Sequence, residues 1–263
     1  MAVVVLSVAG SDPSGGAGIQ ADLKTFHAFG VFGTTVVTSL TVQNTLGVQS
    51  RCDQTPAFVA AQLDAVLEDL PVVAAKTGLL PDAAVVATVA ERLRAHGITT
   101  LVVDPVLVAT SGDALTAPST TQAIGLHLLP LASLVTPNLH EAHELTGRPV
   151  RTVSEMRDAA RWLVDRGASA ALVKGGHLPE RACDVLATAH ETYELDGPRI
   201  DVGPTHGTGC TLSAAITAEL ARGHPLLDAV ITAKAYVRRA LAAALPIGRG
   251  SRMLDHRVRT DDT

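Results

Sequence analysis

The chain has 263 residues and a formal net charge of −5, with 47% hydrophobic, 18% charged and 3% aromatic residues. This length suits one large α/β domain or two small ones, and the core must be built mainly from Ala, Val, Leu and Ile. No cluster of Lys and Arg points to nucleic acid or to an anionic membrane surface, so we expect a small molecule as the partner.

The N-terminal segment and the cysteines bear on where the protein works. Residues 1–10, MAVVVLSVAG, are apolar but lack a basic start and are too short to span a bilayer, so they indicate a buried first strand. The widely spaced Cys52, Cys183 and Cys210 predict neither a disulfide framework nor a zinc site of the CxxC type. We therefore expect reduced thiols and a cytoplasmic location.

Short apolar runs alternate with longer segments of helical periodicity along most of the chain. The runs are AVVVLSV, TTVVTS, PVVAAK, TTLVVDPV, ASLVTP and ASAALVK. This alternation predicts an α/β fold with a mainly parallel sheet, covered by helices on both faces and joined by right-handed crossovers. Because the chain has no internal repeat, low-complexity tract or linker-like shift in composition, we expect a single domain over residues 1–263.

Three later segments have patterns of their own. Thr152 and Glu155 have the spacing of a capping box, and Gly167 suits a helix C-terminus, which predicts a helix between them. The Thr, Tyr and Val-rich runs in residues 183–202 predict two or three short antiparallel strands, with a turn at residues 196–198. The tail from about residue 249 is expected to be loosely ordered.

Four glycines crowd residues 10–18, between the first strand and the first helix. Glycine permits sharp turns and close approach of a ligand, but the segment matches neither the GxGxxG nor the GxxxxGK[ST] pattern. A ligand-binding turn and a plain strand-to-helix turn therefore both stay open. Asp22 falls on the buried stripe of the following helix and needs a partner there, which could be a ligand or the positive end of the helix.

Adjacent amides stand in the otherwise apolar segment TSLTVQNTLGV, at Gln43 and Asn44. An amide carries both a donor and an acceptor, which suits the edge of a nitrogen heterocycle, although loop amides also bond to backbone.

Polar side chains follow two predicted strands, Asp104 after one and Asn138 with Glu141 after the next. In open α/β sheets ligands bind beyond the carboxyl ends of the strands, and a Mg²⁺ that keeps most of its waters could be held there by one or two carboxylates. Asn138 and Glu141 equally have the spacing of a capping box.

The last two motifs are suited to anions. Lys174 ends an apolar strand before two glycines, where it could reach a phosphate or extend to water. Residues 207–209, Gly-Thr-Gly, precede a helix and expose backbone N–H groups, which makes an anion site. Cys210 follows, either as a thiolate favoured by the positive helix terminus or as a small buried hydrophobe.

Taken together, these motifs resemble those of the hydroxymethylpyrimidine/phosphomethylpyrimidine kinases of the ribokinase superfamily. The matching segments, in chain order, are AGSDPSGGAGIQADLKTF, TVQNTLGVQS, KTGLL, VVDPV, SGDAL, TPNLHEA, VKGGH and GTGCTLSAAI. The resemblance implies a ribokinase-like three-layer α/β/α fold and an ATP- and Mg²⁺-dependent kinase, usually a homodimer. Its acceptors would be 4-amino-5-hydroxymethyl-2-methylpyrimidine and then the monophosphate, in thiamine biosynthesis.

The resemblance also implies roles for individual residues. The pyrimidine pocket would contain Gly10, Asp22, Gln43, Leu79 and Val106. The nucleotide side would contain Lys174, Asn138 and Thr205, and the metal would be held by Asp104 and Glu141. The anion hole would be formed by Gly207, Thr208 and Gly209, and Cys210 would replace the aspartate base of sugar kinases.

The chain departs from the family pattern at two points. Leu79 stands where members often carry Met, and the tail has GRGSRMLDH in place of a Gly-His-Gly-Pro segment. Two alternatives stay open: a pyridoxal or pyridoxine kinase, and a pyrimidine-binding protein without catalysis. A nicotinamide-dependent dehydrogenase is disfavoured because no GxGxxG follows the first strand.

Overall fold

The computed structural model describes residues 2–108, 116–176, 178 and 182–260. The SGDAL segment, residues 111–115, and His177 of VKGGH lie outside the described residues. The strands are β1 (Val4–Ser11), β2 (Phe32–Asn44), β3 (Gly47–Asp53), β4 (Val72–Thr77), β5 (Leu101–Val103), β6 (Leu134–Val135), β7 (Ala170–Val173), β8 (Ala182–Thr188), β9 (Thr192–Gly197), β10 (Thr205–His206) and β11 (Arg252–Met253). The helices are α1 (Gly18–Ala28), α2 (Pro56–Asp69), α3 (Ala83–Ala95), α4 (Pro118–Ala123), α5 (Leu139–Thr146), α6 (Val153–Asp165), α7 (Thr208–Ala221) and α8 (Leu226–Ala242), and α4 continues into a π-helical and a 3-10 turn over residues 124–131.

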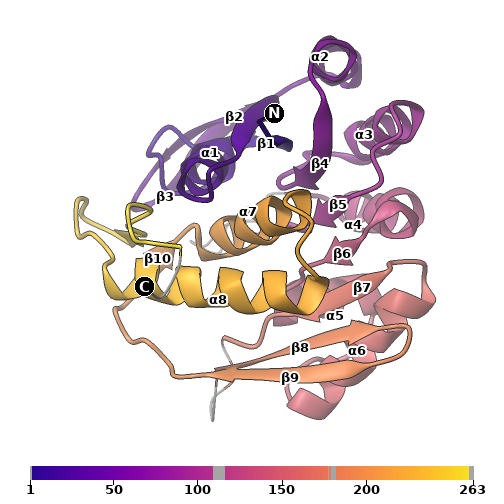
Figure 1. The fold of residues 1–263 in the computed structure, drawn as a ribbon. Coiled ribbons are helices and arrows are strands. Elements are labelled where there is room, and N and C mark those ends of the chain that lie inside the picture. Colours follow the sequence, from indigo (N-terminus) through magenta and orange to yellow (C-terminus); the bar gives the residue numbers. More distant parts are fainter. Residues whose placement is uncertain (1, 109–115, 177, 179–181, 261–263) are drawn as a thin grey trace.

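Strands β1 to β9 form one sheet in the order β3-β2-β1-β4-β5-β6-β7-β8-β9 (Figure 1). The central pairs from β2 to β7 are parallel, whereas β3 at one edge and β8 and β9 at the other are antiparallel to their neighbours. The sequence prediction of a mainly parallel sheet with a short antiparallel part is therefore confirmed.

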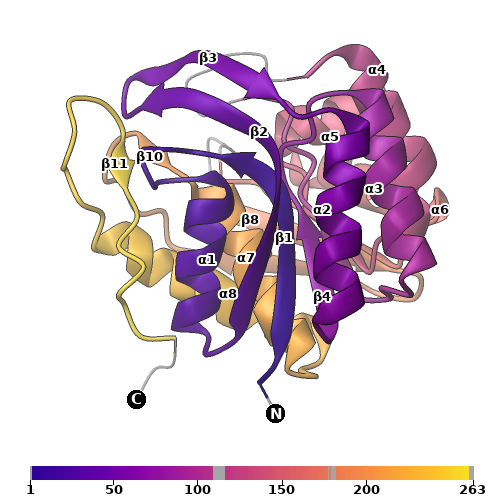
Figure 2. The same ribbon diagram turned by 90° about the horizontal axis from the view of Figure 1, so that it is seen from above.

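Helices cover both faces of this sheet, as Figure 2 shows from above. Helices α2 to α6 pack on one face and α1, α7 and α8 on the other, each over its own apolar core. Because side chains alternate along a strand, Leu6 and Val8 of β1 enter the first core and Val5 enters the second. The predicted three-layer α/β/α arrangement follows from this double coverage.

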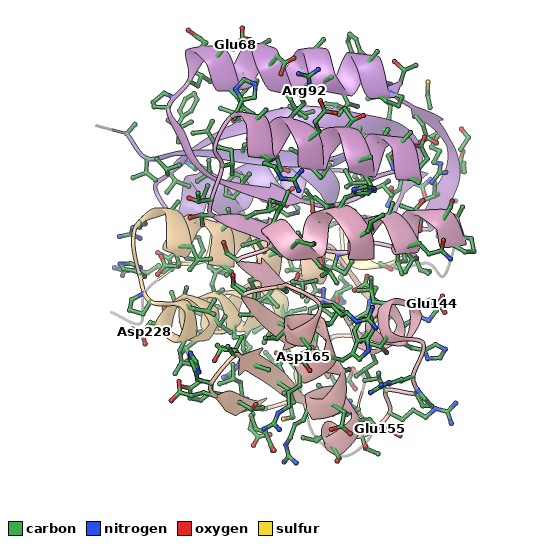
Figure 3. All side chains as sticks on the ribbon, turned by 90° about the vertical axis from the view of Figure 1, so that its right-hand side faces the viewer. Glu68, Arg92, Glu144, Glu155, Asp165 and Asp228 are labelled. Atoms are coloured by element: carbon green, nitrogen blue, oxygen red, sulfur yellow. The ribbon has the colours of Figure 1, made fainter. Side chains whose placement is uncertain are left out.

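Several charged side chains lie on the outer helix surfaces, among them those of Glu68, Glu144, Asp165 and Asp228 (Figure 3). Helix α6 begins with the predicted capping box, in which the Thr152 hydroxyl and the Glu155 carboxylate each accept a backbone N–H of the other residue. Gly167, just beyond its end, has a φ of 113°, in the region that favours glycine.

The antiparallel edges differ in detail from the prediction. The hairpin of β8 and β9 turns between Thr188 and Thr192, and residues 196–198 instead mark the end of β9, so the predicted turn position was wrong. Strand β3 was not predicted, because it is mostly exposed and so carries no alternation of buried and exposed side chains.

The C-terminal segment is packed over residues 252–256, which differs from the loose order that the sequence predicts. Strand β11 pairs with β10, and Met253, Leu254 and His256 are buried. The His256 carbonyl accepts a hydrogen bond from the Tyr236 hydroxyl at 3.0 Å, and its ring Nε2 lies 3.0 Å from the Thr211 hydroxyl. Met253 and Leu254 are adjacent in a short polar segment and form no periodic pattern in the sequence. Only these tertiary contacts therefore show that the segment is ordered. In the part of the chain that the structure describes, no helix is long and apolar enough to cross a membrane.

Candidate active site

A cleft of about 770 Å³ opens at the carboxyl ends of the parallel strands. Ligands of open α/β sheets bind at this edge, because parallel strands all end there. Of the residues that the sequence assigns to the site, all but Asp22 line the cleft. They are Gly10, Gln43, Leu79, Asp104, Val106, Asn138, Glu141, Lys174, Thr205, Gly207, Thr208, Gly209 and Cys210.

The glycine turn after β1 is held by Asp12, a residue that the sequence analysis missed. The Asp12 carboxylate accepts the backbone N–H groups of Ser14, Gly16 and Ala17 at 2.8–3.1 Å. Burial alone would raise its pKa, but these bonds and one from His206 lower the pKa of Asp12 to about 2. The signal was present as Asp-Pro-Ser-Gly, in which an aspartate accepts the N–H two residues ahead.

The second glycine turn, before α7, packs directly on the first. Gly207 has a φ of 84°, and a Cβ atom there would overlap the carbonyl oxygen of Gly16. A Cβ at Gly209 would lie 3.3 Å from the Lys174 Nζ atom. The open backbone at the start of α7 therefore faces a lysine ammonium, the environment that an anion requires.

The Lys174 ammonium lies between two buried carboxylates. Its Nζ is 3.0 Å from Asp104 Oδ1 and 3.8 Å from Glu141 Oε2, so it does not extend into water. Asp104 also accepts hydrogen bonds from the hydroxyls of Thr136 at 3.2 Å and Ser213 at 3.3 Å. These contacts hold the three charges at the floor of the cleft.

The two carboxylates respond differently to burial. Burial raises the pKa of Glu141 to about 7, against the opposing pull of Lys174, and the negative Asp104 adds to the rise. Burial acts on Asp104 in the same direction, but the ammonium groups of Lys174 and Lys76 hold its pKa below the usual range. The pKa of Lys174 is raised by both carboxylates despite its burial, so this ammonium stays charged.

Asn138 and Glu141 form the capping box that their spacing predicts. The Glu141 N–H donates to Asn138 Oδ1 at 2.9 Å, and the Asn138 N–H donates to Glu141 Oε2 at 2.7 Å. Both residues line the cleft as well, so the cap itself holds the Glu141 carboxylate at the ligand site. Among the described residues there is no group of three or more His, Cys, Asp and Glu side chains that could hold a metal ion.

Asp22 lies behind the cleft, and the expectation that it lines the pyrimidine pocket was wrong. Its carboxylate is fully buried, with Lys76 Nζ 3.0 Å from both oxygens and the Ser7 hydroxyl at 2.5 Å. Ser7 and Lys76 stand at paired positions of β1 and β4, facing α1. The buried stripe of α1 thus turns Asp22 toward the sheet, where a lysine from a distant strand satisfies it.

Lys76 lies behind the cleft with Asp22, and no role was predicted for it from the sequence. Burial alone would lower its pKa, but Asp22, Cys210 and Asp104 raise the pKa above the usual value, so the ammonium is charged. A lysine at the end of the apolar run PVVAAK was a signal for a buried ion pair, although its partner could not be identified without the fold.

Cys210 lies in the first turn of α7, half-buried, and receives the backbone N–H of Gly18 at the start of α1. Burial raises the pKa of its thiol to about 11, and the carboxylates of Asp22 and Asp104 add to the rise. The Lys76 ammonium lowers this pKa, but by less than burial raises it. Of the two alternatives for Cys210, this raised pKa favours the buried thiol over the thiolate in the unliganded site.

The cleft also has an apolar part. Gly10 packs on Leu79, whose Cδ2 would lie 3.0 Å from a Cβ at Gly10, and Val106 adds apolar surface. Gln43 reaches into the cleft from β2, close to the Thr41 hydroxyl and to His206. The structure thus places an amide and apolar walls in the same cleft as the anion site.

Known proteins that are similar in sequence point to one family. Residues 12–255 match the family model described as phosphomethylpyrimidine kinase. The chain is 49% identical over 260 residues to the hydroxymethylpyrimidine/phosphomethylpyrimidine kinase of Rhizobium meliloti (strain 1021), covering 97% of both chains.

Two solved structures are similar over most of their length. A phosphomethylpyrimidine kinase from Clostridium difficile 630 has a TM-score of 0.82 and 38% identity, covering 90% of this chain and 99% of its own. The pyridoxal kinase of Bacillus subtilis, in an ADP complex, has a TM-score of 0.89 and 36% identity, covering 96% of this chain and 97% of its own.

The buried pair of Asp22 and Lys76 makes a testable contribution to stability. We expect Lys76→Met to lower the free energy of unfolding by about 3–5 kcal/mol, because it leaves the Asp22 charge buried without its partner. Adding Asp22→Asn to Lys76→Met should recover a large part of that loss. Urea denaturation of the single and double variants measures both effects.

Lys24→Met is the matched control, since Lys24 is exposed, and its loss should stay below about 1 kcal/mol. A double variant as unstable as the sum of the two single variants would show that the two side chains do not interact.

Proposed function

The chain belongs to the phosphomethylpyrimidine kinase family, and from this premise we propose that it is an ATP-dependent kinase of thiamine biosynthesis. It phosphorylates 4-amino-5-hydroxymethyl-2-methylpyrimidine on the hydroxymethyl group and then converts the monophosphate to the diphosphate. The observation that carries this proposal is that one cleft holds an anion site, with Lys174 and the start of α7, together with a ring site containing Gln43.

The nucleotide side of the cleft is suited to phosphoryl transfer. This reaction depends on alignment and charge stabilisation, because its transition state is loose. Gly207, Thr208 and Gly209 would direct backbone N–H groups at the transferring phosphoryl group, and Lys174 would supply a fixed positive charge. We assign Asn138 and Thr205 to the nucleotide as well, since both line the same cleft. ADP in the similar B. subtilis kinase supports ATP as the donor.

Asp104 and Glu141 are the residues that would hold Mg²⁺. Both are buried, and when both are ionised they share the Lys174 ammonium, so the three groups carry one excess negative charge, which favours binding of a cation. Mg²⁺ commonly takes one or two protein carboxylates and completes its shell with water and phosphate oxygens. When bound, it would neutralise charge on the phosphates.

Cys210 is the proposed general base for the alcohol. Its thiolate would take the hydroxyl proton as the oxygen attacks the γ-phosphorus, and the bond from that phosphorus to the bridging oxygen breaks to release ADP. In the second step the acceptor is a phosphate monoester, whose second pKa of about 6 leaves it ionised at neutral pH. The second step therefore has no proton for Cys210 to remove.

The acceptor side favours the pyrimidine over pyridoxal. Gln43 offers a donor and an acceptor side by side, and an aminopyrimidine offers the complementary amino group and ring nitrogen. Gly10, Leu79 and Val106 would cover the ring. Asp22 acts from behind the site, through Lys76, and not by contact with the ring.

The test of the function is ADP production with ATP and Mg²⁺ on three acceptors: the hydroxymethylpyrimidine, its monophosphate and pyridoxal. We expect turnover of both pyrimidines and little with pyridoxal. A preference for pyridoxal would move the assignment to vitamin B6 salvage, and binding of the pyrimidine without any ADP would indicate a non-catalytic protein.

We also propose a cytoplasmic homodimer of single-domain subunits. The hairpin of β2 and β3 supports the dimer, because it exposes Leu40, Val42 and Leu46 by 50%, 53% and 58% at one edge of the sheet. Apolar side chains gathered on one exposed edge are typical of a contact with a second chain.

Replacing Cys210 should separate the two phosphorylations. We expect Cys210→Ala to lower kcat for the alcohol by about 10²- to 10⁴-fold, because a general base is lost, and to change kcat for the monophosphate little. The exposed Cys52→Ala is the control and should match the unsubstituted protein on both acceptors. Equal losses on the two acceptors would leave Cys210 as a packing residue.

The two steps should also differ in pH dependence. Because the pKa of Cys210 is raised to about 11, the thiolate fraction, and with it kcat for the alcohol, should rise about 10-fold per pH unit between pH 7 and 9. The monophosphate is already ionised in that range, so its kcat should stay nearly level. The same slope on both acceptors, measured with saturating ATP and Mg²⁺, would exclude Cys210 as the titrating base.

A further inference from the structure

Three side chains from distant parts of the chain meet at one ring nitrogen in the cleft. His206, from β10, has its Nε2 atom 2.9 Å from Asp12 Oδ2 in the turn after β1. The same Nε2 lies 3.0 Å from the side-chain amide of Gln43 on β2. All three residues line the cleft, and Asp12 and His206 are buried. In the proposed reaction Gln43 binds the pyrimidine edge, whereas His206 has no part.

Asp12 decides where the His206 ring carries a hydrogen. Its carboxylate already accepts the N–H groups of the glycine turn, so it is an ionised acceptor held in place. An unprotonated ring nitrogen at 2.9 Å would face it lone pair to lone pair. The His206 Nε2 atom therefore carries a hydrogen, and this holds for the neutral ring and the imidazolium alike.

A hydrogen on Nε2 in turn decides the direction of the Gln43 amide. Two N–H groups cannot bond to each other, so the amide atom facing His206 is the oxygen, and the 3.0 Å contact of Gln43 Nε2 is relieved by a half-turn of the amide group. The nitrogen then faces the Thr41 hydroxyl, 3.1 Å from the amide, which donates its own hydrogen to the Ser11 carbonyl at 2.9 Å. Each hydrogen in this chain of contacts has an acceptor.

The direction of the amide determines how an aminopyrimidine can lie. The acceptor carries, in order around its ring, a nitrogen, the carbon with the amino group and the carbon with the hydroxymethyl group. The amide nitrogen donates to the ring nitrogen and the amide oxygen accepts from the amino group. The hydroxymethyl group is next to the amino group on the ring, so it lies on the side of the amide oxygen. When that oxygen faces His206, the hydroxymethyl group also lies on the side of His206, where the chain continues into Gly207 and the anion site.

We infer that His206, held by Asp12, orients the Gln43 amide and so turns the hydroxymethyl group of the aminopyrimidine toward the phosphoryl group. His206 is a positioning residue that sets specificity for the amino group. This inference rests on the proposed function. The opposite direction of the amide would place the hydroxymethyl group on the Thr41 side, away from the start of α7.

The test compares two alcohols, the hydroxymethylpyrimidine and the same molecule without its 4-amino group. We expect His206→Leu to lower kcat/KM for the amino compound by about 10-fold, with a much smaller change for the compound that lacks the amino group. His206→Gln, which can keep an N–H donor near Asp12, should recover most of the loss. In a Gln43→Leu background His206→Leu should have little further effect. Equal losses on both alcohols, or additive losses of the two substitutions, would overturn the inference.

A control variant and an NMR measurement complete the test of the role of His206. His190→Leu, at the exposed turn between β8 and β9, is the matched control and should leave both values unchanged. The ¹⁵N NMR shifts of the His206 ring in the unsubstituted protein should show a hydrogen on Nε2, and a ring protonated on Nδ1 alone would overturn the inference even if His206→Leu fails to fold. Absence of turnover of either alcohol by the unsubstituted protein would instead refute the proposed function, and the NMR result would still decide the role of His206.

Discussion

The site depends on the close contact of two glycine turns. The turn after β1 and the turn before α7 touch through backbone atoms, since a Cβ at Gly207 would overlap the Gly16 carbonyl. Within the first turn, a Cβ at Gly18 would overlap the Gly10 carbonyl. The contact brings the starts of α1 and α7 together at Cys210, which receives the Gly18 N–H. A side chain at Gly207 would therefore push the two turns apart.

The charges under the cleft are arranged around this contact. Lys76 pairs with Asp22 behind Cys210, and Lys174 pairs with Asp104 and Glu141 at the cleft floor. Buried charges of both signs are costly unless they are paired, so each ammonium holds its carboxylates at a fixed position. The consequence is a polar floor in which both ammonium groups and their carboxylates are held at fixed positions under the cleft.

Local patterns were enough for the parts of the site that follow strand ends. Asp104, Asn138 and Lys174 were found because each follows an apolar run, and parallel strands must end at one edge. Lys76 and His206 were not assigned a role, because each acts on a residue at least 54 positions away that only the fold brings near. Asp12 was missed although its local signal, Asp-Pro-Ser-Gly, was present. Asp22 was correctly identified as buried and in need of a partner, yet its partner is Lys76 and not a ligand.

By itself the sequence determined the α/β class, the parallel sheet, the capped helices and the glycine turns, because these follow from periodicity and from backbone preferences within a few residues. The tertiary structure alone decided the β3 edge strand, the packed segment of residues 252–256, the thiol state of Cys210 and the contact of Asp12, His206 and Gln43. The physical reason is that burial, pKa and hydrogen-bond direction depend on groups that only the folded chain brings together.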